Sequence, residues 1–332
     1  MVSRSMNALA ESGELGAWSS WRNGRPPGYF DLPLGREVGE FYRDQGFFVV
    51  DAALSPDEVE ALRSETLAIA KGERGKVREA PEFTPDMTDD EILRQILCIH
   101  FPHKISEVML AAVKQPAVVE ALQTAIGLNV KCMQSMLFVK ASGKPGQAWH
   151  QDEIYIPTRD RSLTGAWIAL DDATVENGCL WVLPGSQKPG VLYFQEWHGD
   201  RRFDCAWEAR RFPYSNDDAV PVEVKAGSIV VFNGYTLHRS LPNTAPSGFR
   251  RSLVNHYMSA ESLLPWFYQK GNEAVATLDH RDVILVCGED PYAWKGYEDT
   301  HTSHIRPDGK GGCGNFEYNS DPVTSSDEEA KS

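Results

Sequence analysis

One change of pattern, near Gly127, constrains the fold of this chain more than any other feature. Before it the sequence carries helix signals: residues 55–58 (SPDE) and 88–91 (TDDE) are capping boxes, and AVVEALQTAI stops at Gly127. The first box has proline at the first helical position, so we expect a helix from there to about Lys71. A shorter helix, REVGEFYRDQ, leads into the apolar strand segment GFFVVDAAL.

After Gly127 the chain has the pattern of a series of short strands. They are rich in β-branched and aromatic residues and are separated by turn signals such as Glu176-Asn177-Gly178. The strand segments are VKCMQSMLFVK, AWHQDEIYI, GAWIALDD, GCLWVLPG, VEVKAGSIVVFNG and RRSLVNHYMS. Helices followed by a meandering antiparallel region predict a mainly β, α+β fold: a jelly-roll or barrel with N-terminal helices against one face.

The 332 residues suffice for one large β domain with helical additions or for two smaller domains. No internal repeat is visible, and we favour a single domain over residues 1–332. We divide it into a surface segment (1–34), a helical buttress (35–127), a β core (128–260), a C-terminal extension (261–320) and a frayed acidic tail (321–332). Residues 186–220 form the longest break between strands, and such loops are often lids or binding loops.

Charge and cysteine usage exclude several classes of partner. A formal net charge of -14 disfavours nucleic acid, which prefers a basic surface, and disfavours anionic membranes. We find neither a signal-peptide pattern nor an 18-residue apolar run. Cys98, Cys132 and Cys179 lie in apolar surroundings, as reduced thiols do, so we expect a soluble cytoplasmic protein. The sequence does not determine the oligomeric state.

The segment His150-Gln151-Asp152, followed by His238 and Arg250, carries the chemistry. On a strand, residues i and i+2 share a face, so we expect His150 and Asp152 to reach into one cavity. His238 ends the apolar block SIVVFNGYTLH, where a barrel strand can bring it opposite them. Two imidazoles and one carboxylate hold one face of a non-haem Fe(II) octahedron and leave three positions open. The competing interpretation makes Asp152 a surface acid and His238 a hydrogen-bonded residue at a strand end.

Four segments resemble the phytanoyl-CoA dioxygenase family of Fe(II)/2-oxoglutarate oxygenases, over roughly residues 46–260. They are QSMLFVKAS, AWHQDEIYI, GAWIALDDATVENGCLWVLPGSQ and GSIVVFNGYTLHRSLPNTAPSGFRRSLVNHY. The resemblance implies a double-stranded β-helix, cupin-like core, with Fe(II) held by His150, Asp152 and His238 and with 2-oxoglutarate and O₂ as cosubstrates. It also implies hydroxylation rather than halogenation, because related halogenases have a small residue in place of the carboxylate.

The same resemblance places the distal carboxylate of 2-oxoglutarate on Arg250 and the rest of the molecule near Met136 and Trp167. In several family members the arginine lies eleven residues after the distal histidine, whereas Arg250 lies twelve after His238. One extra turn residue in LPNTAPSG accounts for the difference. Arg251 remains the alternative, and only one of the two can face the cosubstrate, because adjacent strand residues face opposite sides.

Several other residues admit two interpretations. His100 and His103, in CIHFPHKIS, resemble a family segment near the pocket mouth, and either contact substrate or pack at a helix end. Arg159 and Arg161 either attract an anionic substrate group or are ordinary surface arginines. Trp197, in the long loop, either lines a pocket or fixes the loop to the barrel.

Three more histidines could be metal ligands: His256, His301 and His304. His256 is more typical of a buried, hydrogen-bonded core histidine than of a ligand. His301, His304 and Cys313 suggest a zinc clip, but their spacing matches no standard finger and the segment is rich in glycine.

The sequence therefore predicts an Fe(II)/2-oxoglutarate-dependent dioxygenase that hydroxylates an unactivated C–H bond of a small organic metabolite and releases succinate and CO₂. The alternatives are a non-catalytic jelly-roll protein that binds metal or 2-oxoglutarate, and a cupin-type metal isomerase or hydrolase. The acidic charge disfavours a large polyanion such as CoA and favours a small polar or zwitterionic substrate. The sequence does not choose among acyl-CoA thioesters, amino-acid-like solutes and natural products.

Overall fold

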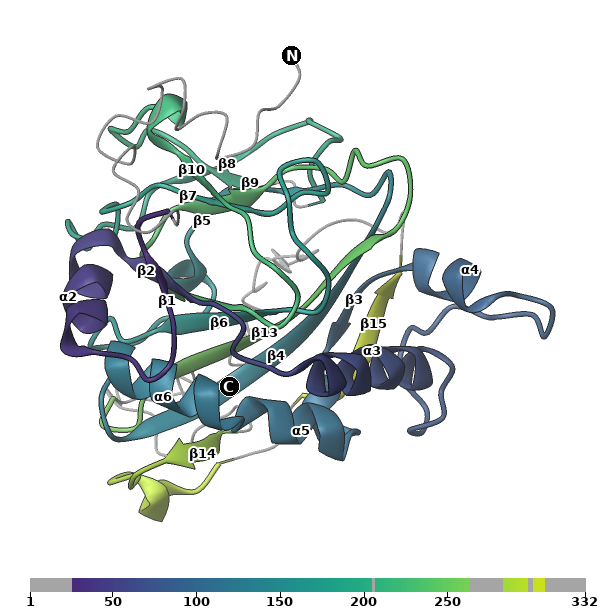
Figure 1. Ribbon diagram of the computed structural model, residues 1–332, viewed down its shortest axis with the longest axis horizontal. Helices are drawn as coiled ribbons and strands as arrows, with labels where there is room; N and C mark the ends of the chain where they lie inside the picture. The colour runs from purple at the N-terminus through teal and green to yellow at the C-terminus, as the bar shows by residue number, and fades with distance from the viewer. Residues whose placement is uncertain (1–25, 205–206, 263–282, 298–300, 308–332) are drawn as a thin grey trace, which may run out of the picture.

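Two facing β-sheets and a set of helices make up the computed structural model in Figure 1, which describes residues 26–204, 207–262, 283–297 and 301–307. The larger sheet runs in the order β1 (Tyr29–Phe30), β2 (Phe47–Val50), β11 (Ile229–Asn233), β6 (Thr164–Ala169), β13 (Phe249–Ser259), β4 (Val130–Ala141), β3 (Ile96–His100) and β15 (His304–Pro307), with β14 (Ile284–Cys287) also paired to β4. The smaller sheet runs β10 (Val220–Val222), β7 (Leu180–Val182), β12 (His238–Ser240) and β5 (Gln147–His150). The predicted fold is confirmed: a mainly β, double-stranded β-helix with flanking helices.

Helices cover the outer face of the larger sheet, as Figure 1 shows for α3, α5 and α6 beside β4 and β13. The helices are α2 (Arg36–Gln45), α3 (Pro56–Ala70), α4 (Asp89–Arg94), α5 (Glu107–Val113) and α6 (Pro116–Ala125). Both predicted capping boxes form, with the Ser55 and Thr88 side chains accepting from the backbone N–H of Glu58 and Glu91. The sequence did not predict α5 or β3.

The larger sheet is buried on both faces, and alternate residues of its strands enter different cores. On β6, Ala166 and Ile168 pack with the helices, whereas Trp167 and Ala169 pack between the two sheets. The inner core contains the side chains that face the smaller sheet. Any site between the sheets is therefore built from this inner set.

One expected strand ends earlier than the sequence indicated, and the apolar block before His238 is divided. The segment AWHQDEIYI is a strand only to His150, and Asp152–Ile154 form one turn of 3₁₀-helix. The segment SIVVFNGYTLH is also broken: β11 ends at Asn233 and His238 begins β12. The expectation that Asp152 lies on the same strand as His150 was therefore wrong, whereas His238 lies opposite His150 as expected.

Segments outside the predicted β core complete the sheets. β2, from the region before Gly127, pairs with β11, and β14 and β15 come from the region after residue 260. The long break at 186–220 carries a two-stranded ribbon, β8 (Gln195–Trp197) with β9 (Trp207–Ala209). In the described part of the chain no helix has the length and apolarity needed to cross a membrane. Most of the proposed surface segment (1–25) and the acidic tail (321–332) lie outside the described residues.

Candidate metal centre

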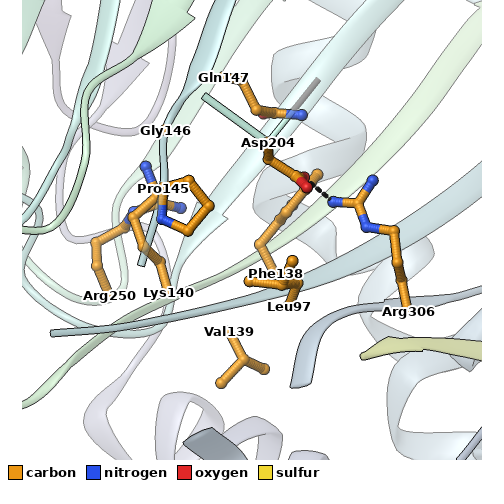
Figure 2. Close-up of a pocket in the computed structure, with 10 residues that line it drawn as sticks. All are labelled: Leu97, Phe138, Val139, Lys140, Pro145, Gly146, Gln147, Asp204, Arg250 and Arg306. Carbon is orange, nitrogen blue, oxygen red and sulfur yellow. Dashed lines mark hydrogen bonds and ion pairs between the residues drawn. The ribbon is translucent and has the colours of Figure 1, made fainter. Parts of the chain in front are cut away.

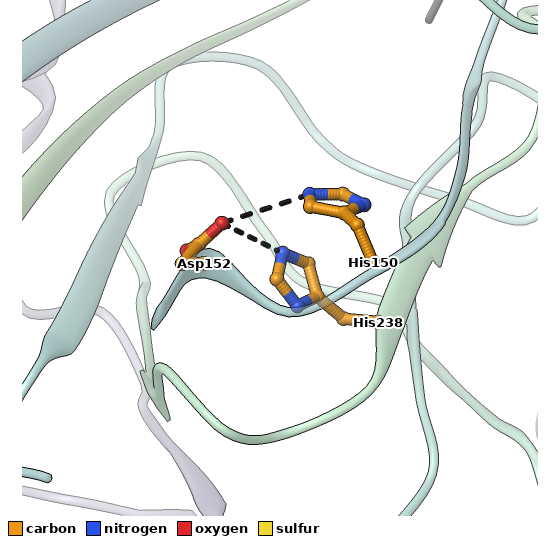
Figure 3. A group of neighbouring side chains, drawn as sticks. All are labelled: His150, Asp152 and His238. Carbon is orange, nitrogen blue, oxygen red and sulfur yellow. Dashed lines mark ion pairs between the residues drawn. The ribbon is translucent and has the colours of Figure 1, made fainter. Parts of the chain in front are cut away.

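Three side chains predicted as metal ligands converge between the ends of the smaller sheet's strands. His150 and His238 are directly paired across β5 and β12, and Asp152 reaches them from the 3₁₀ turn that follows β5 (Figure 3). Asp152 Oδ1 lies 3.7 Å from His150 Nε2 and 3.6 Å from His238 Nε2. One ligand atom from each residue lies within 4.8 Å of the other two. Atoms at such separations can share one metal ion, because metal–nitrogen and metal–oxygen bonds of about 2.1 Å span them.

Both histidines are oriented by the same local contact. The Nδ1 atom of His150 lies 2.8 Å from Ala148 O, and the Nδ1 atom of His238 lies 3.0 Å from Thr236 O. A carbonyl can only accept, so each Nδ1 carries the proton and each Nε2 keeps its lone pair for a metal. Each ring is thus fixed in its ligating tautomer by a residue two positions earlier.

The ionisation states also suit a cation. Burial, followed by the neighbouring His238, lowers the pKa of His150 to about 4, so this imidazole is neutral at physiological pH. Burial alone would raise the pKa of Asp152, but His238 and His256 beside it hold that pKa below its ordinary value. Two imidazoles and one carboxylate are the donor set that Fe(II) takes in non-haem oxygenases, so the residues present fit this metal.

The two candidate arginines face opposite sides of β13. Arg250 is buried, its Nη1 donates to Ser252 Oγ at 2.9 Å, and its guanidinium lies 5.4 Å from the centre of the Trp167 ring. Arg251 makes a two-pronged ion pair with Asp171, with its Nε and Nη2 at 2.9 and 2.8 Å from the carboxylate oxygens. Arg251 therefore already has a carboxylate partner, whereas Arg250 points into the space between the sheets.

A cavity reaches Arg250 from the side of β5 and the long loop (Figure 2). Asp204 of that loop and Arg306 of β15 form an ion pair across it, and both side chains are nearly buried. The residues lining the cavity are Leu97, Phe138, Val139, Lys140, Pro145, Gly146, Gln147, Asp204, Arg250 and Arg306. Segments far apart in the chain thus enclose the space beside Arg250.

Lys140 and Ser240 complete this end of the site, and the sequence analysis missed both. Lys140 is directly paired with Arg250 across β4 and β13, and its Nζ donates to Ser240 Oγ at 2.9 Å and to Leu241 O at 2.8 Å. Burial, then Arg250, lowers the pKa of Lys140 well below its ordinary value. Within the described residues neither cation makes an ion pair. A lysine after the apolar run MLFV of β4, and a serine two residues after His238, were the signals available in the sequence.

Met136, Trp167 and His100 lie in one row across the larger sheet. His100 pairs with Met136, Met136 with Val254, and Val254 with Trp167. Directly opposed residues share a face, so all four side chains face the inner core that contains Trp167 and Val254. His100 stacks on His304 with ring centres 4.4 Å apart, and burial, then His304, lowers the pKa of His100 to about 3.

The other predicted contact residues are placed differently. His103 is buried and bonds Ser135 Oγ, on the side of β4 opposite to Met136, which favours packing. Arg159 and Arg161 are exposed, and the Arg161 guanidinium lies 5.5 Å from the centre of the Tyr235 ring. Trp197 is 70% exposed and packs edge-on against Trp207.

The zinc clip considered for His301, His304 and Cys313 depends on Cys313, which lies outside the described residues. His304 is used in the stack with His100. Among the residues that the structure describes, the His150, Asp152 and His238 group alone brings together three potential metal ligands.

The fold and this centre define a class: a double-stranded β-helix with a two-histidine, one-carboxylate cluster of the kind that non-haem iron oxygenases use. The family model of phytanoyl-CoA dioxygenase (PhyH) matches residues 42–252, which is more than half of the chain. The chain therefore belongs to the phytanoyl-CoA dioxygenase family.

The individual relatives share 25–38% of the aligned residues with this chain. An Arabidopsis thaliana phytanoyl-CoA dioxygenase is 38% identical over 117 residues, covering 33% of this chain and 38% of the relative, so the match spans less than half of that protein. A Danio rerio phytanoyl-CoA dioxygenase domain-containing protein 1 is 26% identical over 274 residues, covering 70% and 92%. The solved structure of SnoK, a non-heme alpha ketoglutarate dependent carbocyclase from nogalamycin biosynthesis, matches with a TM-score of 0.52 at 25% identity, covering 72% and 89%.

Proposed function

We propose that this chain is an Fe(II)/2-oxoglutarate-dependent dioxygenase that hydroxylates a C–H bond of a small organic metabolite. The observation that carries the proposal is the convergence of His150, Asp152 and His238 beside the same inner core that encloses the buried Arg250. When bound, Fe(II) with 2-oxoglutarate would supply the activation of O₂, with succinate, CO₂ and a hydroxylated product as the outcome.

The protein's own contribution at the metal end is orientation. The backbone carbonyls of Ala148 and Thr236 hold both imidazoles with Nε2 toward the centre, so no ring has to turn when metal binds. Three protein ligands on one face leave the opposite face for cosubstrate and O₂.

At the other end, Arg250 binds the distal carboxylate of 2-oxoglutarate through charge-assisted hydrogen bonds. Burial lowers the pKa of Arg250 to about 10, so the guanidinium remains charged at neutral pH. Trp167, beneath the guanidinium, and Met136, on the same inner face, line the path from Arg250 to the metal.

Ser240 adds a hydrogen-bond donor to this carboxylate. Its Oγ accepts from Lys140 Nζ at 2.9 Å and from the backbone N–H of Gln147 at 3.2 Å. A hydroxyl oxygen has two lone pairs and one proton, so these two bonds leave the O–H to donate toward the pocket. Lys140 therefore holds the Ser240 hydroxyl as a donor toward the carboxylate.

The proposed organic substrate is a small metabolite, and the cavity that Leu97, Asp204 and Arg306 line is the route by which it would enter. His100 is the best placed of the candidate contacts, since it faces the inner core next to Met136. Arg159, Arg161 and Trp197 lie at the surface, where they would contact a substrate only as it approaches the site. We also propose a cytoplasmic location, because the buried Cys98, Cys132 and Cys179 are all free thiols.

The test is an anaerobic spectroscopic titration with Fe(II) and then 2-oxoglutarate, followed by a metabolite screen read by succinate formation. The proposal expects saturable binding of both and succinate release that rises with one class of metabolite. Binding without any CO₂ would instead indicate a non-catalytic binding protein. Succinate release that survives Asp152→Ala with iron occupancy intact would contradict the assignment of the centre.

A further inference from the structure

His256 makes a contact that the proposed function does not use. It is buried on β13, on the same face as Arg250, and its Nε2 lies 3.0 Å from Asp152 Oδ2. An ionised carboxylate can only accept, so His256 donates this hydrogen bond from Nε2–H. The other oxygen, Oδ1, is the one that faces His150 and His238. The two oxygens of Asp152 therefore have different surroundings.

We propose that His256 is a positioning residue that fixes the Asp152 carboxylate as a one-oxygen metal ligand through Oδ1. This inference rests on the proposed function, because it assumes that Asp152 binds the metal. Without the hydrogen bond to Oδ2, the carboxylate can rotate or offer both oxygens to the ion. Two-oxygen binding would occupy a coordination position that cosubstrate or O₂ needs.

The surroundings of His256 support this role over simple packing. The ring's other nitrogen, Nδ1, is buried and has no hydrogen-bond partner among the described residues. Burying a polar ring costs free energy, and the hydrogen bond to Asp152 is the contact that offsets this cost. The pairing of β13 with β4 also shifts register between His256 and Tyr257. Such bulges re-aim side chains, and this one lies at the residue that contacts the ligand.

The experiment compares two variants of nearly equal shape, His256→Gln and His256→Met, in the full-length protein. Glutamine keeps a donor that can reach Oδ2, whereas methionine has none. Tyr257→Phe is the matched control. Tyr257 follows His256 on β13, and its hydroxyl makes a buried hydrogen bond to Val113 O of α5, away from the metal centre. Circular dichroism and thermal melting establish that each variant is folded.

The readouts are Co(II) affinity by calorimetry, the visible Co(II) absorption spectrum, and kcat and KM for 2-oxoglutarate. We expect His256→Met to weaken Co(II) binding about 10- to 100-fold and to change the spectrum, as loss of an outer-shell partner does. His256→Gln should recover most of the affinity and the wild-type spectrum, and Tyr257→Phe should keep both even if it melts earlier.

Equal Co(II) affinity and identical spectra for the Met and Gln variants would overturn the proposal and leave His256 as a core residue. Failure of the proposed function has a different result: wild-type protein would bind no Co(II), or Asp152→Ala would bind it as tightly as the wild type. If His256→Met does not fold, His256→Leu, which also lacks a donor, replaces it in the comparison with His256→Gln. Loss of affinity in the Leu variant with recovery in the Gln variant supports the proposal, and equal affinities contradict it.

Discussion

The two ends of the site hold their functional side chains in different ways. At the metal end, His150 and His238 sit at the ends of short strands, and each ring is oriented by a carbonyl two residues earlier. At the carboxylate end, Arg250 lies in the eleven-residue strand β13 and depends on neighbours from other strands, such as Ser240 and Lys140 near it. The metal end is thus oriented locally, whereas the carboxylate end is assembled from distant segments.

This difference has a physical reason. A metal ligand needs its lone pair aimed within a narrow range, and a contact two residues away transmits little movement from the rest of the fold. Burying a cation costs free energy unless polar groups surround it, and here those groups come from several packed strands. Substitutions at the metal end should therefore lower the affinity for the metal ion. Substitutions at the carboxylate end should lower the affinity for 2-oxoglutarate.

The largest effect is expected at the metal end. Asp152→Ala removes the one charged ligand and should lower Fe(II) affinity and 2-oxoglutarate turnover by well over about 100-fold, more than loss of an outer-shell partner costs. Calorimetric metal titration and succinate assays measure it. If this variant binds Fe(II) as tightly as the wild type, Asp152 is not a metal ligand, and the two ends of the site do not differ as described.

The next effect separates the two neighbouring arginines at the carboxylate end. Arg250→Met should weaken 2-oxoglutarate binding about 100-fold, since a charge-assisted hydrogen bond in a buried site contributes about 2–3 kcal/mol. Arg251→Met loses the pair with Asp171 and should lower the free energy of unfolding by about 1–3 kcal/mol with cosubstrate affinity retained. Equilibrium binding and chemical denaturation of both variants test this, and the reverse pattern would assign Arg251 as the ligand.

A smaller effect concerns protonation at the metal end. Because the pKa of His150 is about 4 in the fold and about 6.5 in the unfolded chain, the unfolded chain binds more protons between these values. The free energy of unfolding of the metal-free protein should therefore rise with pH from about 4 to 6.5, by at most about 1.4 kcal/mol per pH unit from this group. His150→Gln should show a shallower rise in denaturation curves; an unchanged slope would contradict the assigned ionisation.

The smallest effect is expected for one hydroxyl at the carboxylate end. Ser240→Ala removes a donor to the cosubstrate and should lower 2-oxoglutarate affinity about fivefold, or about 1 kcal/mol. Fe(II) affinity should change little, because Ser240 is not a metal ligand and Lys140 keeps its bond to Leu241 O. Cosubstrate affinity equal to that of the wild type would show that the hydroxyl does not donate to the carboxylate.

Much of the fold could be predicted because its signals are local. The capping boxes at Ser55 and Thr88 and the strand pattern of β6 depend on residues a few positions apart. The strands β14 and β15 could not be predicted, because their place depends on pairing with β4 and β3, which lie far earlier in the chain. The 3₁₀ turn at Asp152 was not predicted either, because the direction of this side chain depends on contacts with His238 and His256, which lie about 100 residues later.

The sequence by itself determined the donor set: two histidines, a carboxylate and an arginine at spacings that only a β-rich chain could bring together. The tertiary structure decided which arginine faces the cavity, through the pairing of Arg251 with Asp171. It also placed Lys140 against Ser240 and His256 against Asp152, contacts that span about 100 residues each. Residue types and their local geometry are encoded in neighbouring positions, but which side chains meet inside a closed sheet depends on the register of strands far apart in the chain.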